Sequence, residues 1–248
     1  MKNLKSKYFE ENQYTKITEY YDLWVTSGYY DYQLMAQEAN QIIGNGAKVL
    51  ELGVGTGLLA QEYLKIDPSC ELTGVDFTAS MLEIAASRVG DRVELIEADA
   101  VDMDLNQKFT AAISNGGVWG ILDLGDTWRF GGHVPGMDKN IQGLKNTAYH
   151  LQPGGLLLLH LQQPHPTYER PLAGGITYAQ SIEELEDTAQ FSTWLKSYFF
   201  QKDGEILAQD QITITCLHPH TSEKILSEAR FEFQGTSKGK KFAIYQKT

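Results

Sequence analysis

From about residue 47 onward, short runs rich in apolar residues alternate with longer segments in which apolar residues recur at helical spacing. This alternation is typical of a mostly parallel sheet with helices on both faces. The short runs predict five successive strands, at residues 47–53, 70–76, 92–99, 109–116 and 154–164. The fifth run is apolar almost throughout, as expected for a strand covered on both faces. We therefore expect an α/β fold, a doubly wound sheet with seven core strands.

Segments with helical periodicity separate these strands. Residues 57–66 and 78–89 follow the first two strands, and residues 137–155 precede the fifth, where Pro153 and two glycines are expected to stop the helix. Ahead of the first strand, residues 19–43 are rich in aromatic side chains, and their second half has helical spacing. We expect this N-terminal segment to pack over the edge of the sheet.

Beyond the fifth strand the pattern changes to an alternation of apolar and polar positions. Residues 191–219, 225–235 and 240–248 show it, around Asp-Gly and His-Pro turns. Alternation of this kind is typical of antiparallel strands with one solvated face, so these runs predict a meander.

Composition narrows the classes of partner. The 248 residues carry a formal net charge of -11, which disfavours nucleic acid because binding to phosphates requires clustered Lys and Arg. No apolar stretch approaches the roughly 18 residues of a membrane span, so we expect no membrane partner. Cys70 and Cys216 lie in apolar runs and are expected to be buried thiols of a cytoplasmic protein. His218 and His220 lack a nearby third ligand, so no metal is predicted.

The turn between the first strand and the first helix reads ELGVGTG, with Glu51 followed by Gly53, Gly55 and Gly57. Open α/β sheets bind ligands at this end of the strands. Glycine allows the backbone to approach a ligand closely and to adopt torsions that a β-carbon would hinder. Tight turns of purely structural origin also carry such glycines, so the neighbouring strands decide what this turn does.

Two aspartates stand at the ends of the next two strands. Asp76 ends the second strand, where an acidic side chain can receive the vicinal hydroxyls of a ribose. Asp99 ends the third strand, where a carboxylate can accept a hydrogen bond from an adenine amino group. Either aspartate alone could be a helix cap. With the glycines after the first strand, these aspartates place candidate ligand contacts at three successive strand ends, and this combination predicts a nucleoside site.

Over residues 45–162 the chain resembles the class I S-adenosylmethionine-dependent methyltransferases, in particular those that act on small molecules. The segments that look like the family's successive motifs are ELGVGTG, GVDFTASML, EADA, AAISNGG and LQPGGLLLLH. The resemblance implies transfer of a methyl group from S-adenosylmethionine to N, O or C of a small metabolite, which leaves S-adenosylhomocysteine.

The resemblance also assigns cofactor contacts to residues at the ends of the first four strands. The methionine part would contact Gly53, Gly55 and Gly57 together with Glu51, and the ribose would contact Asp76. The adenine would contact Phe77, Met81, Asp99 and Ala100, and the sulfonium would lie beside Asn115 and Gly116. The implied architecture is a single domain over residues 1–248.

Within that domain we expect a helical lid at 1–44, a cofactor-binding core at 45–165 and antiparallel strands at 166–248. In the family's commonest ending a helix precedes the final hairpin, whereas residues 227–235 here predict strand. The resulting antiparallel surface suits a lid or a homodimer contact.

Candidate residues for the methyl acceptor are histidines and aromatic side chains. The sulfonium supplies the driving force, so alignment of the acceptor matters more than a catalytic triad. His133 and His165 follow the fourth and fifth strands at the end where sites open, and they are the candidate bases, or else structural loop histidines. Five aromatic residues are candidates to line the substrate pocket, or else pack against the sheet: Tyr21, Tyr29, Tyr30, Trp119 and Trp128. They would favour an apolar or aromatic amine or hydroxyl compound.

Two other functions fit part of the pattern. An NAD-dependent oxidoreductase also binds a ribose through an acidic residue, but Leu58 stands where G-x-G-x-x-G requires its third glycine. Glu51 beside the loop would also repel a pyrophosphate. A non-catalytic nucleoside-binding protein of the same fold would carry the same motifs as an enzyme.

Overall fold

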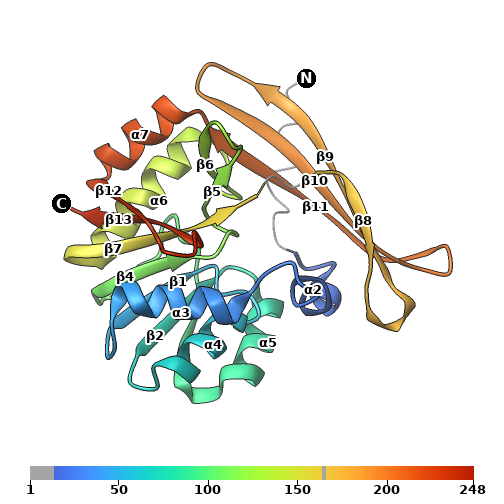
Figure 1. Ribbon diagram of the computed structural model, residues 1–248, viewed down its shortest axis with the longest axis horizontal. Coiled ribbons are helices and arrows are strands. Elements are labelled where there is room, and N and C mark those ends of the chain that lie inside the picture. The colour runs from blue at the N-terminus through green and yellow to red at the C-terminus, as the bar shows by residue number, and fades with distance from the viewer. Residues whose placement is uncertain (1–13, 164–165) are drawn as a thin grey trace.

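The computed structural model describes residues 14–163 and 166–248, and a seven-stranded sheet lies at its centre (Figure 1). Its strands are β1 (Lys48–Leu52), β2 (Glu71–Asp76), β3 (Val93–Glu97), β4 (Phe109–Ser114), β7 (Leu151–Gln162), β12 (Phe231–Thr236) and β13 (Phe242–Lys247). They lie in the order β3-β2-β1-β4-β7-β13-β12, of which the first five are parallel. β13 runs antiparallel to β7, and β12 antiparallel to β13. The predicted doubly wound sheet is therefore confirmed.

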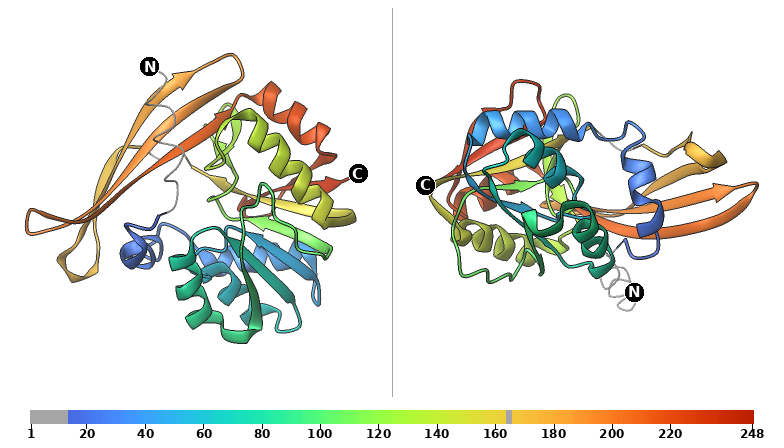
Figure 2. Two further views of the ribbon diagram at one scale, coloured as in Figure 1. Left: turned by 180° about the vertical axis from the view of Figure 1, so that it is seen from behind. Right: turned by 90° about the horizontal axis from the view of Figure 1, so that it is seen from below.

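Helices cover both faces of this sheet (Figure 2). On β1, Val49 packs into one core and its neighbour Leu50 into the other, because side chains alternate along a strand. The helices are α3 (Tyr32–Ile43), α4 (Leu58–Ile66) and α5 (Ala79–Val89) on the Val49 side, and α6 (Gly136–His150) and α7 (Pro219–Glu228) on the Leu50 side. Two short 3-10 turns are η1 (Gly90–Arg92) and η2 (Ala173–Gly175).

A second, antiparallel sheet branches from the end of β7. Its strands are β5 (Gly120–Asp123), β6 (Trp128–Gly132), β8 (Tyr168–Pro171), β9 (Thr177–Asp187), β10 (Phe191–Lys202) and β11 (Glu205–Leu217). The pairing runs β7-β5-β6-β11-β10-β9-β8, and the long strands β9 to β11 extend beyond the central sheet (Figure 1). The helix α2 (Thr18–Val25) lies beside them, so this part of the molecule forms a cap at the carboxyl ends of the parallel strands.

Two sequence predictions about secondary structure were wrong. Residues 219–228 form α7, although residues 225–235 predicted strand throughout. Pro219 occupies the first turn, and Ser222, Ile225 and Leu226 are buried at helical spacing, which outweighs the strand-like alternation. The final hairpin is thus preceded by a helix after all. The residues around His133, expected to be a loop, include the hairpin of β5 and β6.

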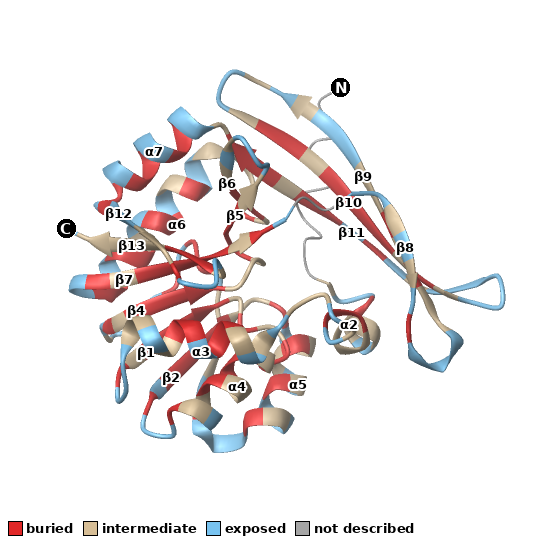
Figure 3. Ribbon diagram, in the orientation of Figure 1, coloured by how far each residue is buried: buried red, intermediate tan, exposed pale blue. Residues whose placement is uncertain are grey.

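The cap has its own aromatic core. Trp24 on α2 stacks on Tyr178 of β9 with ring centroids 4.8 Å apart, and Tyr20 stacks on Phe200 of β10 at 5.2 Å. Figure 3 shows the middle of β10 and β11 buried and the hairpin tips exposed. The N-terminal segment therefore packs against the second sheet as well as over the central one. In the described part of the chain no helix is long and apolar enough to cross a membrane; Cys70 and Cys216 are both buried, free thiols.

A buried carboxylate joins the N-terminal helices to the C-terminal hairpin. Glu38 of α3 accepts hydrogen bonds from the Ser237 hydroxyl and from the backbone N–H groups of Gly239 and Lys241, all in the turn between β12 and β13. Only 6% of Glu38 is exposed. The carboxylate thus satisfies donors that water cannot reach.

We predict that Glu38→Ala lowers the free energy of unfolding by about 3 kcal/mol, because it removes hydrogen bonds to a charged acceptor and leaves buried donors unsatisfied. Urea denaturation followed by circular dichroism measures this. The matched control is Glu228→Ala on α7, whose ion pair with Lys224 is exposed and contributes about 0–1 kcal/mol. Equal losses of stability in the two variants would contradict a stabilising role for the Glu38 hydrogen bonds.

Candidate active site

The glycine turn is held against the second strand by its own backbone. The N–H groups of Gly53 and Val54 donate to the Val75 carbonyl at 2.8 and 2.9 Å, and the Gly55 N–H donates to Asp76 Oδ2 at 2.9 Å. Gly55 has φ +54°, and a β-carbon built there meets only open space. A positive φ is costly for residues other than glycine. The turn therefore presents bare backbone to the space in front of β1 and β2.

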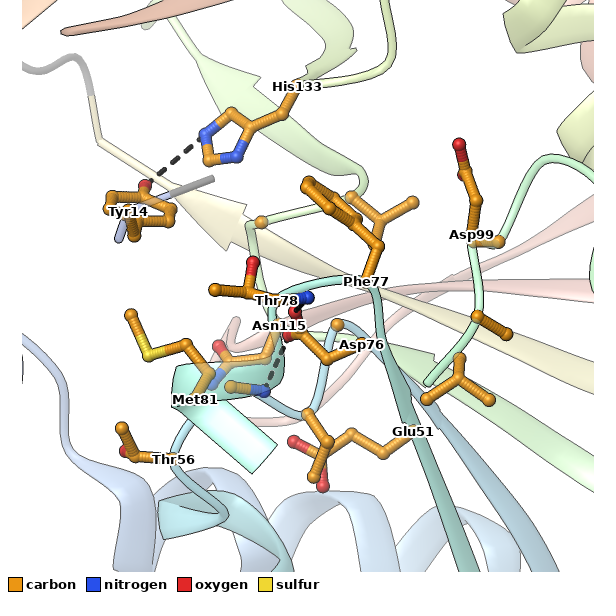
Figure 4. A pocket seen from close by; sticks show the side chains of 18 of the residues that line it. Tyr14, Glu51, Thr56, Asp76, Phe77, Thr78, Met81, Asp99, Asn115 and His133 are labelled. Carbon is orange, nitrogen blue, oxygen red and sulfur yellow. Dashed lines mark hydrogen bonds between the residues drawn. The ribbon is translucent and has the colours of Figure 1, made fainter. Parts of the chain in front are cut away.

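That space is a cavity, which we call the first cavity (Figure 4). The predicted residues that line it are Glu51, Gly53, Gly55, Asp76, Phe77, Met81, Asp99, Ala100 and Asn115. Residues that sequence reasoning missed also line it, among them Tyr14, Thr56, Thr78 and Lys139. The structure thus brings together the ends of β1 to β4, as the strand order requires.

The acidic residues of the first cavity differ in their surroundings. Burial, with a smaller contribution from Asp76, raises the pKa of Glu51 to about 8. Burial also raises the pKa of Asp76, although hydrogen bonds from the Thr78 and Gly55 N–H groups oppose the shift. Asp99 is exposed and accepts a hydrogen bond from the Val101 N–H at 2.9 Å. In Figure 4 the Phe77 ring lies between Asp99 and the Tyr14–His133 pair.

A second cavity adjoins the first, beneath the cap. Tyr14, Tyr21, Asn115, Gly117 and His133 line both cavities. The predicted substrate residues Tyr29 and Tyr30 line the second cavity, as does Gly116. The buried Asn115 Oδ1 has no hydrogen-bond partner among the described residues. The shared wall is where molecules bound in the two cavities would meet.

His133 stands in this wall. Its Nε2 lies 3.4 Å from the Tyr14 hydroxyl, which in turn lies 3.2 Å from the Tyr198 hydroxyl. Burial and the nearby Lys196 lower the pKa of His133 to about 3, so its imidazole is neutral at physiological pH and a weak proton acceptor. His165, the other candidate base, lies outside the described residues.

Three predicted site residues lie away from both cavities. Gly57 begins α4, where a β-carbon would lie 3.3 Å from the Ala85 side chain, so this glycine allows close packing. Trp119 is fully buried in the core with its indole N–H donating to Asn140 Oδ1 at 2.8 Å. Trp128, 38% exposed, packs against Phe233 on the outer surface. Because the turn after β4 and the β5–β6 hairpin direct these tryptophans elsewhere, they do not line the expected pocket.

Lys196 is the main residue that the sequence analysis missed. It lies on β10, lines the second cavity and is only 1% exposed. The pattern Trp194, Lys196, Tyr198, Phe200 places a lysine among aromatic residues on one face of a strand. That break in the alternation was a signal available in the sequence.

In the part of the chain that the structure covers, no group of three or more His, Cys, Asp or Glu could hold a metal ion.

Asp22 fastens α2 to the rim of the first cavity. Its Oδ1 accepts a hydrogen bond from the Thr56 hydroxyl at 2.6 Å, and its Oδ2 forms an ion pair with Arg88 of α5. Arg88 also donates to the Thr56 carbonyl in the glycine turn. The helix of the cap and the glycine turn are therefore linked by one polar cluster.

The architecture and the glycine turn define a Rossmann-like methyltransferase fold. It is shared with Streptomyces venezuelae DesVI (TM-score 0.69, 18% identity, 92% of this chain and 97% of that one). It is also shared with SAM-bound CalS10, described as an amino pentose methyltransferase from Micromonospora echinaspora (TM-score 0.67, 17% identity, 92% and 96%). At these identities the likeness concerns the fold.

The family follows from the sequence comparison. Residues 49–155 match the family described as "Methyltransferase domain", which confirms the resemblance to class I methyltransferases. A malonyl-[acyl-carrier protein] O-methyltransferase of Priestia megaterium (strain DSM 319 / IMG 1521) is 34% identical over 34% of this chain and 31% of its own length. A demethylmenaquinone methyltransferase of Chlamydia pneumoniae is 30% identical over 52% of this chain and 51% of its own. The chain thus matches about a third to a half of the length of these curated relatives.

We predict that Asp22→Ala speeds hydrogen exchange of the α2 backbone amides about tenfold or more, because it removes a charged hydrogen-bond partner that holds this helix on the glycine turn. Exchange followed by mass spectrometry measures this. Glu19→Ala is the control, since Glu19 is exposed on the same helix. Unchanged protection of α2 in Asp22→Ala would show that aromatic packing alone holds the helix.

Proposed function

We propose that this protein is an S-adenosylmethionine-dependent methyltransferase that acts on a small molecule. The observation that carries the proposal is that Glu51, Asp76 and Asp99, from three neighbouring strands, line one cavity with a glycine turn. The family match covers the strands that build this cavity. The structure of CalS10, which shares the fold, is SAM-bound and adds support for the cofactor.

The residues of the first cavity fit such a cofactor. Glu51 is a buried carboxylate to which no described residue donates a hydrogen bond, and a cationic ammonium or sulfonium would stabilise its charged form. Asp76 is proposed to hold the ribose hydroxyls. The remaining proposed contacts are those of Gly53 and Gly55 to the methionine part, of Phe77, Met81, Asp99 and Ala100 to the adenine, and of the unpartnered Asn115 Oδ1 near the acceptor.

When bound, S-adenosylmethionine supplies a methyl group on a positively charged sulfur, which already carries the driving force for transfer. The protein's contribution is then to align the acceptor and to exclude water. The cap encloses the second cavity with Tyr21, Tyr29 and Tyr30. We assign His133 a positioning role, in which its neutral ring fixes the Tyr14 hydroxyl in the wall that the two cavities share.

The two alternatives have less support. The relatives named above whose names state an activity are methyltransferases, and Leu58 occupies the position of the third dinucleotide-binding glycine. A non-catalytic nucleoside-binding protein would have no need of a second cavity that adjoins the first. Release of S-adenosylhomocysteine in a screen of acceptors separates an enzyme from such a protein.

We predict that calorimetric titration detects binding of S-adenosylmethionine and S-adenosylhomocysteine, but not of NAD, at concentrations on the order of millimolar or below. Asp76→Ala should weaken binding by about 10- to 100-fold because a charged hydrogen-bond acceptor is lost. Asp91→Ala in the exposed turn η1 is the control. Tighter binding of NAD than of S-adenosylmethionine would overturn the proposal.

The raised pKa of Glu51 predicts a pH dependence of cofactor binding. With a pKa of about 8, Glu51 is mostly protonated at pH 7 in the free protein. A cation binds the ionised form, so binding at pH 7 should release a proton. The affinity should then rise by up to about tenfold per pH unit as the pH approaches 8 and level off above it. Calorimetry in buffers of different ionisation enthalpy measures the number of protons released on binding.

Glu51→Gln serves as the matched variant for this pH dependence. The amide cannot titrate, so its affinity should be lower at pH 8 and should vary less between pH 6 and 8. An equal pH slope in the wild type and in Glu51→Gln would assign the proton to another group.

A further inference from the structure

The two cavities have opposite charge. Three acidic residues, Glu51, Asp76 and Asp99, and one lysine, Lys139, line the first cavity, whereas the charged residues that line the second, among those the structure describes, are Lys196 and Arg129. The protein as a whole is acidic, with a net charge of -11. The positive charge of the second cavity is therefore opposite to the net charge of the protein.

Lys196 lies within a group of aromatic rings. Its Nζ is 4.8 Å from the ring centroid of Tyr198, 5.5 Å from that of Trp24 and 5.6 Å from that of Tyr29. The same nitrogen donates a hydrogen bond to the Tyr29 hydroxyl at 3.3 Å. Such ring faces attract cations, and here the protein's own ammonium already occupies them. A cationic acceptor would find these faces filled and a like charge beside it.

Arg129 adds a second observation. It lies on β6, where one terminal guanidinium nitrogen donates to the Ser192 hydroxyl at 3.0 Å. Its Nε is buried and has no hydrogen-bond partner among the described residues. Buried polar groups are usually paired, so an unpaired N–H donor on a residue that lines the cavity is consistent with an acceptor supplied by a ligand.

The burial of Lys196 is costly to the fold. Desolvation lowers the pKa of its ammonium to about 7, and a methionine of similar shape at this position would avoid the cost. An anionic ligand would favour the charged form of the lysine. Groups held in an unfavourable environment of this kind are common at binding sites.

We propose that the second cavity binds an acceptor with an apolar or aromatic body and an anionic group, a carboxylate, which pairs with Lys196 in a cavity that Arg129 also lines. This inference rests on the proposed methyltransferase function, and it replaces the amine among the acceptors expected from the sequence. The body of the acceptor lies against Tyr29 and Tyr30, and its reactive end points to the wall shared with the first cavity.

Three probes with the same body test the charge preference: 3-phenylpropionate, 3-phenylpropionamide and 3-phenylpropylamine. Each is titrated calorimetrically into the protein with and without saturating S-adenosylhomocysteine. We expect the acid to bind at least about tenfold more tightly than the amide, and the amide more tightly than the amine. An amine that binds as tightly as the acid, or an acid that fails to bind at about 10 mM, overturns the inference.

Lys196→Met tests the residue, with Lys202→Met as the matched control because Lys202 is exposed at the end of the same strand. We expect Lys196→Met to abolish the preference for the acid over the amide while its melting temperature is unchanged or higher. Lys202→Met should keep that preference. An undiminished preference in Lys196→Met overturns the assignment, and Lys196→Arg, which keeps the charge, should retain a measurable part of it.

The titrations also separate failure of this inference from failure of the proposed function. If S-adenosylhomocysteine binds but the acid shows no advantage, only the acceptor class is wrong. If S-adenosylhomocysteine does not bind, the methyltransferase proposal fails. The titrations of the three probes into the protein without S-adenosylhomocysteine then still decide whether the second cavity prefers an anion.

Discussion

The site depends on the parallel pairing of β1 with β2, which fixes the glycine turn against Asp76. The Val75 carbonyl accepts from the first two N–H groups of the turn, and the Asp76 carboxylate accepts from Gly55. These hydrogen bonds hold the backbone of the turn in front of the sheet, where the buried Glu51 lines the same cavity. Because parallel strands end at the same edge, the side chains that follow β3 and β4 then reach the same cavity. Every proposed cofactor contact follows from this arrangement.

The cap adds walls to the sheet edge, so that two adjoining cavities form there. Its stability comes from aromatic packing, with Trp24 stacked on Tyr178, and its attachment comes from the Asp22 cluster. Large rings bury much apolar area, and Trp24, which stacks on Tyr178, also lines the second cavity. The same packing that joins α2 to the second sheet therefore shapes the second cavity, so changes in the cap alter stability and acceptor binding together.

Charge distinguishes the two cavities more sharply than shape does. Glu51 and Lys196 are both buried, and burial shifts the pKa of each toward its neutral form. A cationic ligand relieves the first and an anionic ligand the second. Their position on either side of the wall that includes Tyr14 and His133 suits a reaction between two molecules of opposite charge.

The sequence determined the central sheet and the residues at its strand ends. The periodicity of apolar residues is local, and glycines or aspartates that follow parallel strands meet at one edge whatever the loops do. Tertiary structure decided the rest. Trp119 entered the core and Trp128 the outer surface because the β5–β6 hairpin set their directions. Residues 219–228 became helix because their burial against the sheet outweighed a strand-like pattern. The alternation along β10 marks Lys196 as unusual, but the rings of Trp24 and Tyr29 that surround it come from a remote segment, and only the tertiary structure shows that contact.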